Sequence, residues 1–285
     1  MLSPVPATCS GCGLTFGVQD GVADWYVPPP DNESERVTQA NIQLHDGCAD
    51  SYENSDLNQV FSTESIEAAR AELRLLARRG RTHRLLDIGC GSGFILRAAE
   101  PLFDEIYGID VSQNMLKLAQ RYRATLLRAS AYDLPFADCV FDAVTCHATL
   151  HHLYDMARLF SEIQRVLSPD GFLYIDHDPN RLFKKWFGWQ IWWRGLRLAK
   201  KRRQTFHFEN EEMMHLAEYH HFHSGGIDGP QVERALRASG LADVEVRYSF
   251  PDRPDRFTRI LMALDRIVPA RAFHYNISFV ARRPA

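Results

Sequence analysis

The sequence lacks any long apolar run. No stretch approaches the roughly 18 consecutive apolar residues that a membrane-spanning helix needs, and the first residues do not show the charged and then apolar pattern of a secretion signal. The 45% hydrophobic and 24% charged residues are ordinary for a globular protein. We therefore expect a cytoplasmic protein whose 285 residues bury a full core, as one large domain with appendages or as two unequal domains.

Cysteine is also scarce. Six Cys in 285 residues do not make the dense framework of a disulfide-stabilised secreted protein, so we expect reduced thiols. Cys9 and Cys12 form a Cys-x-x-Cys pair of the kind that holds zinc, but the second Cys pair that would complete a tetrahedral site is missing. His45 and Cys48 have the right internal spacing to replace it, yet 32 residues separate them from the first pair. We favour the interpretation that Cys9 and Cys12 form a degenerate Cys-x-x-Cys turn that binds no zinc.

The net charge is small, but the charged residues are unevenly distributed along the chain. The net charge is −3, and residues 181–203 hold nine Lys or Arg and no Asp or Glu. Removing these nine positive charges leaves −12 on the rest of the chain. One short segment is therefore basic and the rest of the protein is acidic, which disfavours a broad nucleic-acid binding surface.

The most informative stretch is residues 85–94, LLDIGCGSGF. A short apolar strand leads into a glycine turn, residues 89–93, and then into a helix, which is how an open α/β sheet builds a nucleotide-sized pocket. Glycines let a ligand approach the backbone, and the start of the helix favours an anionic group. A dinucleotide site would want a further glycine two residues beyond Ser92, where Phe94 stands, and no carboxylate such as Asp87 before the turn. A ligand that carries a carboxylate together with cations fits better.

A carboxylate suited to a ribose follows at the expected distance. Residues 105–110 predict a second strand that ends in Asp110, 21 residues after Gly89. At that separation a βαβ unit brings a carboxylate to ribose hydroxyls. Asp110 is equally suited to cap the helix that begins near Ser112. If Asp110 binds a ribose, Val111 and Met115 would offer an apolar face to the adenine of the same ligand.

These motifs resemble those of class I S-adenosylmethionine (SAM)-dependent methyltransferases. The resemblance runs in order over residues 84–176 and includes RVLSPDGFLYI, which is similar to the family's RVLkPGG signature with Asp170 in place of the first glycine. It implies an α/β fold, a Rossmann-like, seven-stranded, mostly parallel sheet with helices on both faces. It also implies that SAM is bound by Asp87, Gly89, Cys90, Gly91, Asp110, Val111, Met115, Ser130, Ala131 and His147.

Two parts of this predicted site need comment. Ser130 stands where the family usually has an acid for the adenine amine, and a hydroxyl accepts the same hydrogen bond without charge assistance. The fourth predicted strand, residues 140–146, is followed by His147, His151 and His152. No carboxylate or thiol stands at matching spacing, so we expect no metal. The resemblance makes His147 a neighbour of the methionine end and His152 a packing residue, and a proton-accepting role for His151 or His152 stays open.

The rest of the chain divides around this domain. Residues 1–60 are expected to form a zinc-ribbon-like or lid segment, and residues 61–285 the methyltransferase domain. Its inserts at about 180–226 and 251–273 would lie on the acceptor side. In the first insert Leu182, Trp186, Trp189 and Trp193 would share one face of a helix. Such a helix suits a roof over an apolar pocket, peripheral contact with a membrane surface or a grip on RNA; the plain alternative is a helix packed on the body.

The predicted function is methyl transfer from SAM to an O, N or C nucleophile of a small, apolar or lipid-like acceptor. One alternative is an RNA methyltransferase, suggested by the ribbon remnant and the basic helix. Another is a non-catalytic scaffold with the SAM-binding fold, which the departures at Ser130 and Asp170 allow. The sequence identifies neither the catalytic base nor the oligomeric state.

Overall fold

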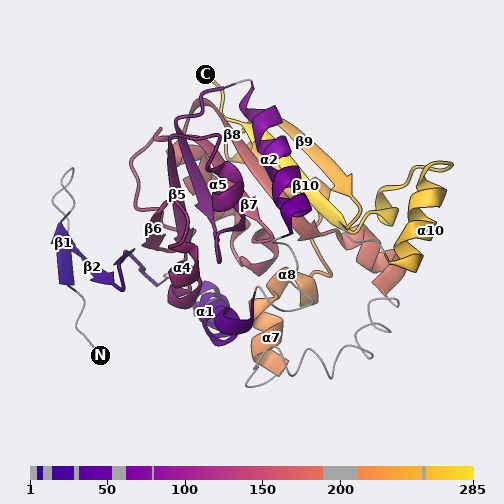
Figure 1. Ribbon diagram of the computed structural model, residues 1–285. Helices are drawn as coiled ribbons and strands as arrows, with labels where there is room; N and C mark the ends of the chain where they lie inside the picture. Colours follow the sequence, from indigo (N-terminus) through magenta and orange to yellow (C-terminus); the bar gives the residue numbers. More distant parts are fainter. Residues whose placement is uncertain are drawn as a thin grey trace.

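The computed structural model describes residues 5–8, 15–28, 32–52, 62–78, 80–188, 211–251 and 255–285. A ten-stranded sheet crosses the molecule in the order β1-β2-β3-β6-β5-β4-β7-β8-β10-β9 (Figure 1). The seven predicted strands form the continuous part from β6 to β9, and their bounds are β4 (Arg84–Ile88), β5 (Glu105–Asp110), β6 (Thr125–Arg128), β7 (Phe141–His147), β8 (Leu167–Pro179), β9 (Ala242–Ser249) and β10 (Asn276–Arg282).

The direction of these strands confirms the predicted fold class. The strands from β6 through β5, β4 and β7 to β8 pair in parallel, whereas β10 is antiparallel to both β8 and β9. β4 and β7 are neighbours in the sheet although β5 and β6 lie between them in sequence. The strand order therefore reverses at β4, and ligands of open α/β sheets bind beside such a switch point.

Helices cover both faces of the sheet. One face carries α2 (Thr63–Ala77), α3 (Phe94–Ala99) and α4 (Gln113–Ala119), and the other carries α5 (Met156–Val166) and α9 (Gly229–Ala238). α2 is capped by Ser62, whose Oγ accepts a hydrogen bond of 3.1 Å from the Ser65 amide. The helix packs on α3, where Arg70 donates to the Ala98 carbonyl.

Three strands extend the sheet at its β6 edge. They are β1 (Val5–Thr8), β2 (Thr15–Gln19) and β3 (Val22–Asp24), and β3 pairs in parallel with β6. The Trp25 amide donates to the Arg128 carbonyl at 2.8 Å. The N-terminal segment therefore continues the sheet, and the seven-stranded expectation grows to ten. Cys9 and Cys12 lie outside the described residues, so zinc binding there stays untested, and the boundary at residue 60 stays a prediction.

The main difference from expectation is a long helix, α1 (Asn32–Tyr52), in the segment that we expected to be zinc-ribbon-like or a lid. Its buried side chains Val37, Ala40, Leu44 and Cys48 recur at helical spacing. Asp46 fastens the helix to the start of α4, because its carboxylate accepts from the Ser112 hydroxyl at 2.6 Å and from the Asn114 amide at 3.1 Å. α1 also packs against α7 (Glu211–Ala217).

The two inserts contribute short helices at one end of the sheet. Residues 181–188 are helical, and α8 (Tyr219–Phe222) follows α7 in the first insert; the second contains α10 (Arg256–Asp265) and a turn of 3-10 helix, η3 (Arg271–Phe273). In the first insert Phe183 is buried, whereas Leu182 and Trp186, which we expected to share one helix face, are exposed. Trp189 and Trp193 lie outside the described residues. Within the described part of the chain, none of the helices combines the length and apolar character needed to cross a bilayer.

Candidate active site

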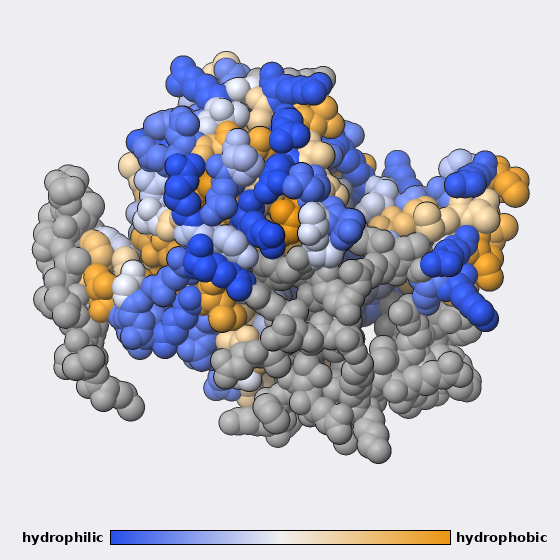
Figure 2. Space-filling view, in the orientation of Figure 1, coloured by the Kyte–Doolittle hydropathy of each residue, from blue (hydrophilic) through white to orange (hydrophobic). Residues whose placement is uncertain are grey.

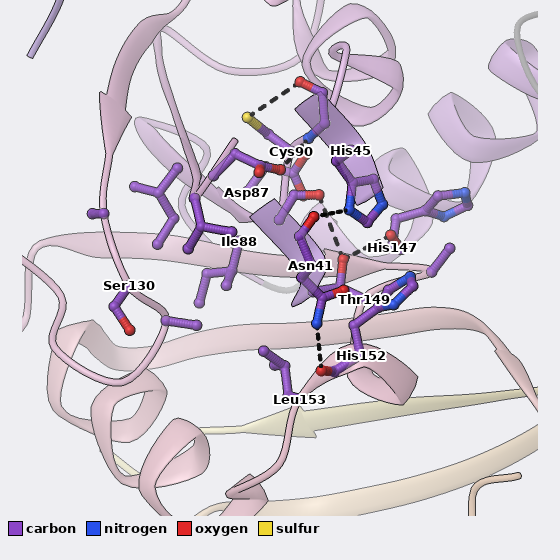
Figure 3. Close-up of a pocket in the computed structure, with 18 of the residues that line it drawn as sticks. Asn41, His45, Asp87, Ile88, Cys90, Ser130, His147, Thr149, His152 and Leu153 are labelled. Carbon is purple, nitrogen blue, oxygen red and sulfur yellow. Dashed lines mark hydrogen bonds between the residues drawn. The ribbon is translucent and has the colours of Figure 1, made fainter. Parts of the chain in front are cut away.

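A cavity of about 200 Å³ opens at the carboxyl ends of β4, β5 and β7, where α1 lies against it (Figure 3). Nine of the ten residues predicted to bind SAM line it: Asp87, Gly89, Cys90, Gly91, Asp110, Val111, Ser130, Ala131 and His147. Met115 is the exception. It is fully buried against Cys48 and Ala49 of α1 and does not line this cavity, and its expected place beside an adenine stays a prediction.

The glycine turn after β4 forms one wall of the cavity. Gly89 has a φ of 69° and Gly91 a φ of 50°, backbone angles that residues with a side chain rarely adopt. A Cβ on Gly89 would lie 2.5 Å from Cγ2 of Thr149, whereas one on Gly91 would meet no atom within 4 Å. Gly89 is therefore required by the packing of the protein itself. At Gly91 the missing side chain leaves backbone open toward the cavity that it lines.

Asp110 is held at the end of β5 by two backbone amides. Gly91 donates to one carboxylate oxygen at 2.8 Å, and Ser112 donates to the other at 2.9 Å. These bonds tie the acid to the glycine turn and to the start of α4. Each oxygen keeps a further lone pair, so the carboxylate can accept hydrogen bonds from two vicinal hydroxyls. Burial raises the pKa of Asp110.

Asp87 is a second, almost fully buried carboxylate at the end of β4. Its Oδ1 accepts a hydrogen bond of 2.7 Å from the Thr145 hydroxyl. Burial raises the pKa of Asp87 to about 8; the Thr145 hydrogen bond opposes this rise, and the nearby Asp110 charge adds to it. Because a cation would stabilise the ionised form, this acid is suited to a positively charged group of a ligand.

Histidines gather on the side of the cavity away from Ser130 (Figure 3). The His147 ring stacks on Phe94 with 4.6 Å between centroids. His152, which we expected to be a packing residue, lines the cavity, and its Nδ1 lies 2.6 Å from the Ala217 carbonyl. Since a carbonyl only accepts, Nδ1 carries the proton and Nε2 holds the free lone pair. Burial lowers the pKa of His152 well below its usual value, and the neighbouring His151 lowers it further.

The fold supplies carboxylate partners for histidines at this site that the sequence spacing did not show. His151 Nδ1 lies 2.8 Å from Oδ1 of the buried Asp178, and His177 Nδ1 lies 2.8 Å from Oδ2 of Asp176. Both acids come from β8, which sequence spacing could not connect to the end of β7. Among the described residues two groups bring three potential metal-ligand atoms within 4.8 Å of one another: His147, Asp176 and His177, and His151, His152 and Glu218. The absence of a metal stays a prediction.

Sequence reasoning missed the contribution of α1. Thr38, Asn41, His45 and Tyr52 all line the cavity. Asn41 Nδ2 donates to the His152 carbonyl at 3.2 Å, and the His45 ring meets the His152 ring edge-on at 5.2 Å. His45 and Cys48, considered as zinc ligands, lie one turn apart in this helix. The buried residues at 37, 40, 44 and 48 were the available signal, and Gly47 in their midst obscured it.

The residues present fit SAM. Asp110 offers acceptors for ribose hydroxyls, the bare backbone at Gly91 leaves room for close approach, and Asp87 offers a negative charge to the cationic methionine end. Ser130, 3% exposed, already accepts a bond from the Tyr132 amide at 3.2 Å. A hydroxyl has two acceptor lone pairs, so this bond leaves capacity for an adenine amine.

Comparison with known proteins agrees with this geometry. The family model described as a methyltransferase domain matches residues 86–175. The demethylmenaquinone methyltransferase of Symbiobacterium thermophilum is 31% identical over 186 residues, which is 61% of this chain and 72% of that protein. The 2-phytyl-1,4-naphtoquinone methyltransferase of Trichormus variabilis is 37% identical over 119 residues, 36% of this chain and 52% of that protein, so this chain spans about half its length.

A solved structure shows the same fold. Phosphoethanolamine N-methyltransferase 2 of Haemonchus contortus, in complex with phosphomonomethylethanolamine and S-adenosylhomocysteine, superposes with a TM-score of 0.55 at 22% identity, covering 91% of this chain and 62% of that one. The fold of this neighbour, the family match and the sequence relatives therefore agree. The chain belongs to the class I SAM-dependent methyltransferases, with SAM as its cofactor.

Proposed function

We propose that the protein methylates an O or C nucleophile on a small, lipid-like acceptor with a hydroxylated aromatic ring, such as a reduced prenylated quinone. The observation that carries the proposal is the wall beyond the SAM-binding residues, where Tyr52, His152 and Leu153 line the same cavity as Asp87 and Gly89. An aromatic ring, an aliphatic side chain and one neutral imidazole suit an apolar ring that bears a hydroxyl. Two relatives are named for quinone acceptors.

The residues around the cofactor contribute binding and orientation. SAM, when bound, supplies a methyl group on a positively charged sulfur, and that sulfur becomes a neutral thioether after methyl transfer. Asp110 and the glycine turn would hold the adenosine and methionine parts, and Asp87 would offset positive charge at the methionine end. Because the donor is already activated, alignment of the nucleophile and exclusion of water are what remains for the protein to provide.

His152 is suited to orient the acceptor hydroxyl. Its lowered pKa keeps the ring neutral at ordinary pH, so Nε2 can accept a hydrogen bond without first losing a proton. The Ala217 carbonyl fixes the tautomer through Nδ1. Behind it, Asp178 overcomes the effect of burial and raises the pKa of His151, and a positive His151 disfavours a second charge on His152. The acceptor proton would pass to Nε2 as its oxygen or ring carbon bonds to the methyl group.

The test follows methyl label from SAM into a reduced prenylated naphthoquinone in detergent micelles. Label is expected in the organic extract. His152→Gln should leave the SAM dissociation constant unchanged and lower kcat roughly 100-fold, the usual range for a lost proton-transfer partner. The matched control is His83→Gln, at an exposed His before β4. Full binding of SAM with no label in any hydroxylated apolar acceptor would overturn the proposal.

A further inference from the structure

The second insert presents an apolar helix face outward. On its inner side α10 packs on the body, where Phe257 contacts the Phe187 ring at 5.5 Å between centroids and Leu261 is buried. On the outer side Ile260 and Leu264 of the helix are 58% and 45% exposed, and Ile267 and Val268, in the turn that follows the helix, are 78% and 64% exposed. Figure 2 shows hydrophobic and hydrophilic residues side by side where α10 projects from the body. Such a two-sided helix leaves one apolar face for another surface.

The charges that surround this face are positive. Arg256, Arg259 and Arg266 are exposed. The two acids among the described residues 255–273 are only partly exposed and bind the backbone: Asp255 accepts from the Thr258 amide at 2.8 Å, and Asp265 accepts from the Ala270 amide at 2.9 Å. The helix therefore offers arginines and aliphatic side chains to the solvent while its carboxylates cap its own ends.

A basic cavity adjoins the helix. Residues 181–188 and η3 form part of its wall, and it is lined by Arg181, Lys184, Lys185 and Arg271. The one acid among its described lining residues, Asp228, is paired with Arg181 at 2.9 Å. The cavity, about 600 Å³, is large enough for a phosphate-bearing headgroup. The exposed Trp186 lies on the same short helix as both lysines.

We propose that this α10 surface, defined by Ile260, Leu264, Ile267, Val268 and the flanking arginines, docks on an anionic lipid membrane. Aliphatic side chains ringed by cations are the pattern of helices that lie at the headgroup boundary. A symmetric pair of copies is disfavoured, because the same arginines would then face one another across a self-complementary interface. Docking would place the protein at the phase in which a lipid-like acceptor dissolves. That advantage rests on the proposed function, whereas docking itself does not.

The experiment is sedimentation of the full chain with vesicles, without SAM or any acceptor, so its outcome is independent of the methylation assay. One vesicle set is phosphatidylcholine alone and the other contains phosphatidylglycerol. Binding is expected to the anionic vesicles and to weaken with salt. Ile267→Ser with Val268→Ser should weaken it roughly tenfold or more. Arg259→Gln should weaken it roughly fivefold, since one cation near an anionic surface is lost.

Two controls separate docking from general effects. Leu75→Ser changes an exposed aliphatic residue on α2, and Arg237→Gln changes an exposed arginine on α9. Both should bind vesicles as the unaltered chain does. Failure of the unaltered chain to bind anionic vesicles would overturn the proposal. So would a dimer in sedimentation equilibrium, without vesicles, that the Ile267 and Val268 substitutions dissociate, because the face would then belong to a second copy.

Discussion

Replacing Asp110 with Asn tests the geometry of the SAM site directly. The substitution keeps the shape of the side chain and one oxygen, but it removes the negative charge and one of the two acceptors. The Gly91 and Ser112 amides donate to the carboxylate at 2.8 and 2.9 Å, so at least one of these bonds must weaken or turn. The remaining oxygen can no longer serve two ribose hydroxyls at once.

The size of the effect follows from the kind of bond that is lost. A hydrogen bond to an ionised group contributes about 1.5–3 kcal/mol, and one between neutral groups about 0.5–1.5 kcal/mol. We expect the Asp110→Asn variant to bind SAM more weakly by about 1–3 kcal/mol, which is roughly a 5- to 150-fold rise in the dissociation constant.

Calorimetric titration with both SAM and S-adenosylhomocysteine makes the test specific. The two ligands share the ribose and differ at the sulfur, so a ribose contact predicts an equal loss for both. A contact with the positive sulfur predicts a loss for SAM alone. Asp104→Asn, at an exposed acid before β5, is the control. Unchanged affinity in a folded Asp110→Asn protein would refute the ribose role.

Two further perturbations test Asp87 and the docking of α1. Because the pKa of Asp87 is about 8 and a cationic ligand favours its ionised form, SAM affinity should rise by up to about tenfold per pH unit from about pH 6 to 8. Titrations of Asp87→Asn should lose that slope, and equal slopes in both proteins would contradict the pairing. Asp46→Ala removes acceptors for Ser112 and Asn114 and should lower the free energy of unfolding by about 1–2 kcal/mol in urea melts. Asp138→Ala, at an exposed surface acid, should change the free energy of unfolding by less than about 1 kcal/mol. Equal losses in the two variants would contradict a stabilising role for the Asp46 hydrogen bonds.

The parts of the fold that were predictable are those in which neighbours in sequence are neighbours in space. The strand β5 was predicted at its observed bounds, and Asp110 at its end does lie beside the glycine turn. A strand, a turn and a helix joined by short connections have few ways to pack, and βαβ units take one hand. The nine lining residues of the predicted site belong to such local units.

The surroundings of some residues depend on distant segments and could not be predicted from the sequence. Met115 lies five residues after Asp110 in the sequence, yet it is buried under α1, a helix that is distant in the sequence. His152 was assigned to packing, because nothing in its neighbourhood showed that α1 would lie over it. The partner of His151, Asp178, comes from the adjacent strand β8.

By itself the sequence determined the fold class and the meeting of the glycine turn with Asp110, because glycine positions, strand periodicity and short connections encode these local units. Only the tertiary structure decided which side chains complete the cavity and which apolar face of α10 stays exposed. Those outcomes depend on how α1 and the two inserts pack against the sheet. Packing between segments far apart in the chain is set by the whole folded surface, and no local pattern records it.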